Sequence, residues 1–291
     1  MSKKTVLVLG ATGMLGSMVY RRLLWATDVC VFGTARKAPE HTVGIFNFDF
    51  DLWDGSHQLH TIINNIKPEF IINCIGKIPQ ASPKNDEEYY QQNYYLPSTI
   101  LNCYPDIKLI QPSTDCVYSG EPIPGRERNL YTIDDIEHYS HEPYGLSKRM
   151  FDDINNNKCV ILRSSIIGPN LHKSGNGLFD WALSKKRQNI NGYKNHFWNG
   201  NTTFEFANRI LEIIRSENYE SGVYTLGNEE IVSKYDLLQM ISKCYKLDLT
   251  ISEFETEKTI DRTLQVSNTL PKISIQLENM KLWLTLQGMK L

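Results

Sequence analysis

The amino-acid sequence predicts an α/β fold, a doubly wound parallel sheet with a smaller C-terminal lobe. Short apolar runs alternate with helical stretches, which is the pattern of a parallel sheet covered by helices on both faces. A glycine-rich turn joins the first run to a helical pattern over residues 14–25, and the alternation stops after Gly168. The strand-like runs lie at residues 5–9, 29–32, 70–75, 108–111, 159–162 and 223–226.

Length and charge limit the functions open to this chain. Its 291 residues include 31 Lys and Arg against 33 Asp and Glu, a formal net charge of −2. Such a chain lacks the basic surface that holds nucleic-acid phosphates, so no nucleic-acid partner is expected. The apolar run at residues 70–75 is far shorter than the roughly 20 residues that span a bilayer, and the N-terminus does not resemble a signal peptide. We therefore expect a cytoplasmic protein without membrane contact.

The turn after the first strand carries the first functional signal. Residues 10–16 read G-A-T-G-M-L-G, a spacing that differs by one residue from the dinucleotide-binding fingerprint. Glycines permit the tight turn and the close approach of a phosphate, while the following helix offers backbone N–H groups and its dipole. This order predicts a Rossmann-type sheet. The expected cofactor contacts here are Gly10, Thr12, Gly13, Met14, Leu15 and Gly16.

The end of the second strand indicates which dinucleotide is preferred. An acidic residue there accepts a hydrogen bond from the ribose of NAD, whereas an arginine accommodates the 2′-phosphate of NADP. The sequence has T-A-R-K at residues 34–37, with no acid. NADPH is therefore the preferred cofactor, with Arg36 as its principal contact and NADH as the alternative. A solvated basic loop is the competing interpretation of Arg36.

Two further strand ends face the same expected site. Asp51 and Leu52 follow a third strand, expected between the runs at residues 29–32 and 70–75, at a position where an adenine ring would lie, although a helix N-cap explains Asp51 equally well. Cys74, Ile75 and Gly76 follow the fourth strand at its carboxyl end, the side on which open α/β sheets bind ligands. We predict cofactor contacts from all five residues, while a tight turn remains an alternative for Gly76.

The chemistry-bearing residues come after the fifth strand and at the start of a later helix. Residues 112–118 read P-S-T-D-C-V-Y, and Tyr144 precedes Lys148 by four positions, which places both on one helix face. A tyrosine that donates a proton near neutral pH needs a lowered pKa, and a neighbouring ammonium lowers it by favouring phenolate. We therefore expect Lys148 to lower the pKa of Tyr144.

At this point the chain resembles the extended short-chain dehydrogenase/reductases, and within them the dTDP-4-dehydrorhamnose reductase family. The resemblance covers nearly the whole chain and is clearest before Gly168. The sequence departs from the family at Cys116, often an aromatic residue there, and near Arg262, which leaves the particular sugar and nucleotide open. The residues that carry the resemblance are 10–16, 73, 112–120, 144–148 and 161–168.

The resemblance implies reduction of the C4 carbonyl of a nucleotide-linked 4-keto-6-deoxy sugar by a reduced nicotinamide. Tyr144 would be the general acid, Lys148 would bind the nicotinamide ribose, and Thr114 would hydrogen-bond the carbonyl oxygen. Ser165 and Ile167, on the strand ending that follows Arg163, would pass near the nicotinamide. The expected partner is thus a nucleotide-linked keto sugar, and a homodimer is the family-level expectation.

The sugar nucleotide is expected between the sheet and the smaller, substrate-binding lobe. Packing within the lobe is an equal alternative role for Phe179 and Trp198. Arg262 is the stronger candidate, because its planar guanidinium suits a pyrophosphate. We divide the chain into a dinucleotide-binding domain of residues 1–167 plus about 202–228 and a lobe of residues 168–201 plus 229–291. The expected substrate contacts are Thr114, Asp115, Asn176, Phe179, Trp198 and Arg262.

Two alternatives to a reductase remain open. An epimerase or dehydratase of the same superfamily would return the hydride from a bound cofactor, and dehydratases often carry a second acid after the threonine, where this chain has Cys116. A non-catalytic NADP-binding regulatory subunit is the other alternative, against which Tyr144 and Lys148 weigh. The sequence shows no cluster of metal ligands that can be assigned, so no metal is predicted.

Overall fold

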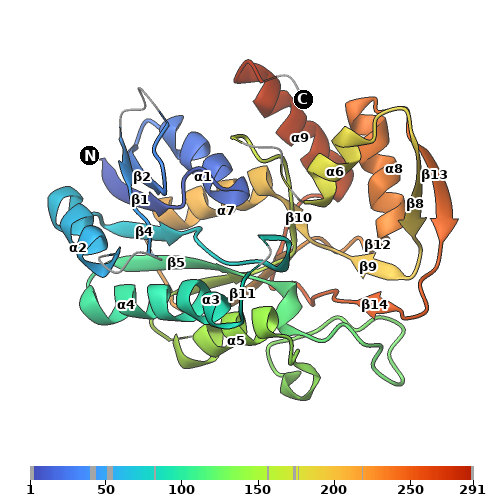
Figure 1. Cartoon of the computed structure of the whole chain (residues 1–291), viewed down its shortest axis with the longest axis horizontal. Coiled ribbons are helices and arrows are strands. Elements are labelled where there is room, and N and C mark those ends of the chain that lie inside the picture. Colours follow the sequence, from blue (N-terminus) through green and yellow to red (C-terminus); the bar gives the residue numbers. More distant parts are fainter. Residues whose placement is uncertain are drawn as a thin grey trace.

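A central parallel sheet organises the computed structural model, which describes residues 3–39, 44–50, 55–81, 83–155, 157–172, 175, 177–217 and 219–289 (Figure 1). Its described strands follow the order β15-β11-β6-β5-β4-β1-β2-β3, and every neighbouring pair is parallel. This confirms the doubly wound α/β fold, since the order reverses between β1 and β4. The strands are β1 Lys4–Leu9, β2 Val29–Ala35, β3 Ile45–Asn47, β4 Phe70–Asn73, β5 Lys108–Ser113, β6 Val160–Arg163, β11 Gly222–Gly227 and β15 Asn268–Thr269.

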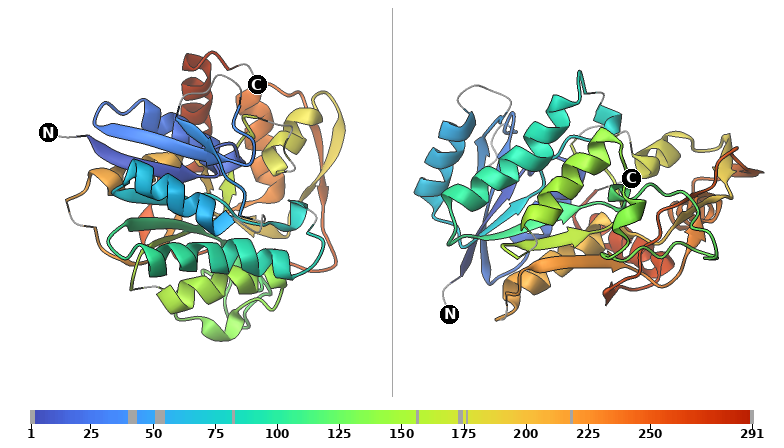
Figure 2. Two further views of the ribbon diagram at one scale, coloured as in Figure 1. Left: turned by 60° about the vertical axis from the view of Figure 1, so that its left-hand side comes forward. Right: turned by 90° about the horizontal axis from the view of Figure 1, so that it is seen from below.

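Helices bury both faces of this sheet, as continuous apolar strands require. Val6 and Val8 of β1 face the cluster formed with α1 and α7, whereas Leu7 and Leu9 face α2, α4 and α5. All four are fully buried, and each such side chain contributes about 1.5–3 kcal/mol. Figure 2 shows α4 beside α5, which also contact each other. The helices are α1 Met14–Leu24, α2 Gly55–Ile66, α3 Glu87–Tyr90, α4 Leu96–Cys103, α5 Pro143–Asn155, α7 Thr203–Arg215 and α9 Ile273–Leu286.

The smaller lobe lies beyond the carboxyl ends of the strands, on the right in Figure 1. It combines two small sheets with two helices, and β9 pairs with both β12 and β14. A further short pair, β7 Ile166–Ile167 with β10 Asn201–Thr202, connects the lobe to the main sheet. The lobe elements are α6 Leu178–Ser184, β8 Asn189–Tyr193, β9 His196–Trp198, β12 Val232–Ser233, α8 Lys234–Tyr245, β13 Thr250–Phe254 and β14 Ile260–Asp261.

Two details differ from the sequence prediction. Residues 229–291 were predicted to lie in the lobe, yet β15 within them extends the main sheet beside β11. The alternation of strand-like and helical stretches was predicted to stop after Gly168, yet residues 169–200 include the strands β8 and β9. These strands are two to five residues long, and partner strands distant in sequence stabilise them, so no apolar run signals them. The predicted division into two domains otherwise stays a prediction.

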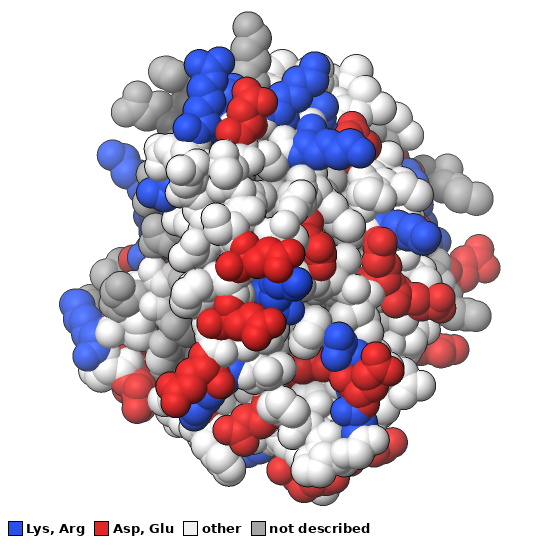
Figure 3. Space-filling view, turned by 90° about the vertical axis from the view of Figure 1, so that its right-hand side faces the viewer, with Lys and Arg blue, Asp and Glu red and all other residues white. Residues whose placement is uncertain are grey.

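The described part of the surface agrees with the near-neutral net charge. Figure 3, which faces the lobe, shows acidic and basic side chains interspersed, with no broad basic area among the described residues in view. Within the described ranges, no helix has the length and apolar character needed to cross a membrane.

Candidate active site

The glycine turn between β1 and α1 has the geometry of a phosphate-binding loop. Gly10 has φ +76°, a left-handed conformation that favours glycine. A Cβ on Gly16 would lie 2.1 Å from the Gly10 carbonyl oxygen, so only glycine lets α1 approach the strand this closely. Gly13 is different, because its nearest neighbour would be 3.5 Å from an added Cβ. The turn is therefore tight at both ends and open in the middle.

The start of α1 fits a dinucleotide pyrophosphate. Gly13 is the N-cap and supplies no side-chain acceptor, and the first turn of α1 contains no acidic residue. The backbone N–H groups at this end thus remain available to an anion, which the helix dipole also favours. Of the other predicted cofactor contacts, Thr12 lies on this turn, and Met14 and Leu15 are the first residues of α1.

The second strand ends beside this turn. Gly10 N–H donates to Thr34 Oγ1 at 3.2 Å, and Ala11 N–H donates to the Thr34 carbonyl at 2.7 Å. Arg36 follows two residues later and is exposed, and no hydrogen bond or ion pair to another described residue holds its guanidinium. Its position suits the ribose end of a dinucleotide. Asp51 and Leu52, the expected adenine contacts, lie outside the described residues.

Thr114 and Tyr144 meet at the carboxyl end of β5. Thr114 Oγ1 accepts from Cys116 N–H at 3.1 Å and donates to Asp115 Oδ1 at 3.1 Å, and the hydroxyl is near enough to the Tyr144 phenol to lower the pKa of that group. Gly145 makes this possible, because a Cβ there would lie 2.1 Å from the Cys116 carbonyl oxygen. The start of α5 therefore packs directly on the turn that follows Thr114.

The predicted lowering of the Tyr144 pKa is wrong for this structure. Burial raises the pKa above its ordinary value, and Cys116 and Asp115 raise it further by Coulombic interaction, while the hydrogen bond with Thr114 opposes the rise. Lys148 is not among the groups that shift the pKa of Tyr144; its ammonium donates to the Pro112 carbonyl at 3.3 Å. Tyr144 is consequently a protonated phenol at neutral pH, ready to donate.

Lys148 joins the fourth strand end to the Tyr144 helix. A Cβ on Gly76 would lie 3.3 Å from Lys148 Nζ, and Cys74 is close enough to favour the charged ammonium. Burial lowers the pKa of Lys148 to about 8, with Asp152 and then Cys74 opposing the shift. The predicted residues Cys74, Gly76 and Lys148 thus lie together, and Ile75 follows Cys74 on the same strand end.

Beneath Lys148 lies a buried ionic network. Asp152 Oδ2 accepts from Ser113 Oγ at 2.6 Å and from Arg163 Nη2 at 3.0 Å. Arg163 Nη1 also donates to the Tyr118 hydroxyl at 2.7 Å. The side chains of Asp152 and Arg163 are almost fully buried, with 1% and 2% of their surface exposed. The network fixes the ends of β5 and β6 relative to α5, one helical turn from Lys148.

The predicted substrate residues divide into different groups. Arg262 lies against the loop that follows β5, since its Nε donates to the Tyr118 carbonyl at 3.2 Å and its Nη2 to the Ser119 carbonyl at 3.1 Å. Phe179 is fully buried and packs edge-on against Tyr245 at 4.9 Å, so it offers no surface to a ligand. Of the two roles expected for Phe179, substrate contact and packing within the lobe, this structure supports packing.

The remaining candidates are two substrate residues, Trp198 and Asn176, and two cofactor residues, Ser165 and Ile167. Trp198 is 2% exposed, and its indole nitrogen is buried without a hydrogen-bond acceptor among the described residues. The Ser165 carbonyl and the Trp198 ring both lie within 3 Å of a Cβ built on Gly200. Ile167 is buried in the core, and Asn176 lies outside the described residues.

The sequence interpretation missed Lys234, which faces the same region. Its Nζ lies 5.3 Å from the centre of the Trp198 ring, and Asp115, Cys116 and Arg262 all affect its pKa. The sequence around it signals only a helix start, a capping box formed by Ser233 and Asp236. Its contact with Trp198 depends on the pairing of β12 with β9.

Asn199 ties the lobe to the sheet. Its side-chain amide donates to the Asn228 carbonyl at 3.3 Å and to the Leu264 carbonyl at 2.8 Å, and its oxygen accepts from Leu264 N–H at 3.0 Å. Three segments distant in sequence thus meet at one buried side chain.

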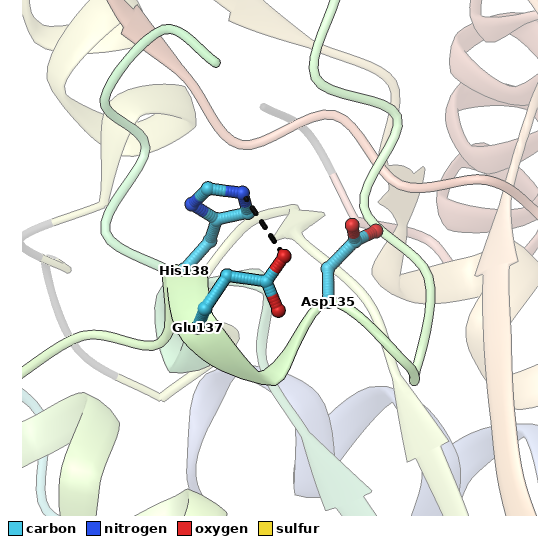
Figure 4. A group of neighbouring side chains, drawn as sticks. All are labelled: Asp135, Glu137 and His138. Atoms are coloured by element: carbon cyan, nitrogen blue, oxygen red, sulfur yellow. Dashed lines mark ion pairs between the residues drawn. The ribbon is translucent and has the colours of Figure 1, made fainter. Parts of the chain in front are cut away.

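One group of possible metal ligands occurs among the described residues, Asp135, Glu137 and His138 (Figure 4). Asp135 is already engaged, since Arg126 Nη2 lies 2.7 Å from its Oδ1, and the ion pair with Arg126 lowers its pKa to about 2. Exposed acidic groups of this kind are common without a metal. The prediction that no metal is bound stays a prediction.

Solved structures of nucleotide-sugar enzymes share this fold. The dTDP-4-dehydrorhamnose reductase of Bacillus anthracis, in complex with NADP, is 20% identical, with a TM-score of 0.75 and 97% of this chain and 99% of that chain covered. The reductase of Clostridium acetobutylicum is 20% identical over the same shares, with a TM-score of 0.74. The UDP-glucose 4-epimerase of Thermotoga maritima, with UDP-glucose, is 13% identical over 98% and 99%, with a TM-score of 0.75. No curated protein matches the chain significantly.

The sequence itself matches one family description. The model of the NAD dependent epimerase/dehydratase family covers residues 6–169, more than half of the chain. The matched stretch includes the glycine turn, Thr114, Tyr144 and Lys148. The resemblance to extended short-chain dehydrogenase/reductases is thereby confirmed, and the protein belongs to the NAD dependent epimerase/dehydratase family.

Proposed function

We propose that this protein is an NADPH-dependent reductase of the C4 keto group of a nucleotide-linked 4-keto-6-deoxy sugar, acting in deoxysugar biosynthesis. The proximity of Thr114 to Tyr144, with Lys148 on the same helix as Tyr144, carries the proposal. Fold similarity to dTDP-4-dehydrorhamnose reductases supports the substrate class. Arg36 directly follows β2 and supports NADPH over NADH, because residues 34–37 at the end of this strand include no acid.

The residues of the chain provide the proton chemistry. When bound, the reduced nicotinamide supplies a hydride to the substrate carbonyl carbon. Thr114 turns its hydroxyl proton from Asp115 Oδ1 to the carbonyl oxygen as negative charge develops there, and Tyr144 transfers its phenolic proton to that oxygen. Burial keeps Tyr144 protonated beforehand. Lys148, one turn further along the same helix, holds the cofactor ribose.

The decisive assay follows NADPH absorbance with dTDP-, UDP- and GDP-linked 4-keto-6-deoxy sugars. Tyr144→Phe removes only the proton donor and should lower kcat by about 10²–10⁴, the range of general acid catalysis. Tyr89→Phe is the matched control, because its ring lies 6.1 Å from that of Tyr144 and its hydroxyl has no proposed role. Absence of turnover with every sugar, together with no effect of Tyr144→Phe, would refute the proposal.

An epimerase or dehydratase reaction is the second candidate, favoured by Asp115. This carboxylate is buried and accepts the Thr114 hydrogen bond, so an acid lies beside the reacting position. An epimerase or dehydratase regenerates its cofactor, whereas a reductase consumes one NADPH per product. Stoichiometric measurement of NADPH and sugar separates the two. A cofactor-binding regulatory subunit would instead bind NADPH and turn over none of the sugars.

A further inference from the structure

Asn47 is the last residue of β3, the strand at one edge of the main sheet. β3 pairs in parallel with β2, and Asn47 lies opposite Ala35, the last residue of β2. The Asn47 side chain reaches further, because its Oδ1 accepts a hydrogen bond from Ala38 N–H at 2.8 Å. Asn47 therefore connects the edge of the sheet to the loop that carries Arg36 and Lys37, where the ribose end of a dinucleotide is expected.

This loop is anchored on both sides of Arg36. Directly before Arg36, the Ala35 carbonyl accepts from Phe48 N–H at 2.8 Å, and the Phe48 side chain is buried in the core beneath. Two residues after Arg36, Asn47 holds Ala38 N–H. The first anchor is made by backbone groups and survives a change of side chain, whereas the second depends on the amide of Asn47 alone. One substitution can therefore remove the second anchor without touching the first.

The anchored loop presents cations that are free to meet an anion. Arg36 and Lys37 are both exposed, and the Arg36 guanidinium has no hydrogen bond or ion pair to another described residue. A cation on a loosely held loop loses the freedom of that loop when it binds, which weakens affinity, whereas a loop that is held beforehand avoids this loss. Asn47 also supplies a neutral acceptor, since a carboxylate in its place would repel a phosphate. The anchor thus suits a loop that binds an anion.

We propose that Asn47 is a positioning residue for cofactor specificity: by holding Ala38 N–H it keeps the Arg36 loop in the conformation that binds the 2′-phosphate of NADPH. The proposal rests on the proposed function, whose cofactor is NADPH, and adds a residue that acts through Arg36. NADH lacks the 2′-phosphate, so the affinity for NADH does not depend on Asn47. A purely structural role would instead weaken the binding of both dinucleotides.

Two variants of the full chain test the anchor and its effect on the cofactor. Asn47→Ala removes the acceptor, whereas Asn47→Asp keeps an oxygen in the same place. Hydrogen exchange of residues 36–39, followed by mass spectrometry, should be faster in Asn47→Ala and close to that of the native chain in Asn47→Asp. In fluorescence titrations, Asn47→Ala should raise Kd for NADPH by about twofold to tenfold, the loss expected for one neutral hydrogen bond. Kd for NADH should stay unchanged.

The double variant Arg36→Ala/Asn47→Ala tests whether Asn47 acts through Arg36, and it should bind NADPH no more weakly than Arg36→Ala alone. Asn85→Ala is the matched control, because Asn85 Oδ1 likewise accepts from an exposed backbone N–H, that of Glu88, and it should leave both Kd values unchanged.

Three results would overturn the role of Asn47 while the proposed function stands: an unchanged Kd for NADPH in Asn47→Ala, equal losses for NADPH and NADH, or a further loss in the double variant. If the native chain binds NADPH no more tightly than NADH, the cofactor preference in the proposed function fails, and the role of Asn47 fails with it.

Discussion

Asp152 belongs to the buried ionic network and also influences the charge of Lys148, so one substitution tests both its structural and its catalytic effect. Asp152→Asn keeps the shape of the side chain but removes its charge, which leaves Arg163 almost fully buried beside a neutral group. Removing one partner of a buried ion pair costs about 3–5 kcal/mol. At about 2 °C per kcal/mol for a chain of this size, thermal unfolding should shift down by roughly 6–10 °C.

The same substitution should alter the pH dependence of activity. Burial lowers the pKa of Lys148 to about 8, and Asp152 opposes that shift. In the native enzyme, activity should therefore fall as pH rises through about 8, because Lys148 loses its proton. Without the carboxylate of Asp152 the pKa falls further, so the loss of activity should begin at lower pH. The measurement is kcat/KM across pH.

Asp153→Asn is the control for both experiments. Asp153 is the next residue on the helix and pairs with Arg149 at 3.7 Å with 49% of its side chain exposed. Exposed pairs contribute at most about 1 kcal/mol, so this variant should melt within about 3 °C of the native protein. The reasoning is refuted if the two variants melt alike, or if Asp152→Asn leaves the pH profile unchanged.

Two further predictions concern the cofactor. Gly16→Ala should lower both thermal stability and NADPH affinity, because its Cβ would lie 2.1 Å from the Gly10 carbonyl oxygen. Gly13→Ala should keep the stability and lose affinity, since its Cβ would meet nothing closer than 3.5 Å. Melting curves and NADPH fluorescence titration check both variants, and equal losses of melting temperature would contradict the reasoning. Arg36→Ala should raise KM for NADPH by about tenfold or more, as expected for a lost hydrogen bond to a charged group, and should leave KM for NADH nearly unchanged. Lys37→Ala is its control, and a parallel rise for both cofactors would contradict the role of Arg36.

Sequence patterns predicted the six long strands and the glycine turn because these features depend on local apolar runs and on backbone freedom at Gly10 and Gly16. Tyr144 and Lys148 were identified through their spacing on a helix. The pKa of Tyr144 was mispredicted because burial depends on what α5 packs against. Lys234 was missed because β12, only two residues long, brings it to Trp198. Such pairings depend on partners far along the chain.

The tie at Asn199 has a consequence for how this protein acquires new specificity. The segments around residues 199, 228 and 264 meet at its side chain, so the chain passes repeatedly between the nucleotide-binding half and the lobe. No single recombination point exchanges one lobe for another. Changes of sugar preference are therefore accessible through point substitutions within the lobe, whereas a graft of a foreign lobe would have to match the segments around residues 199, 228 and 264 at once.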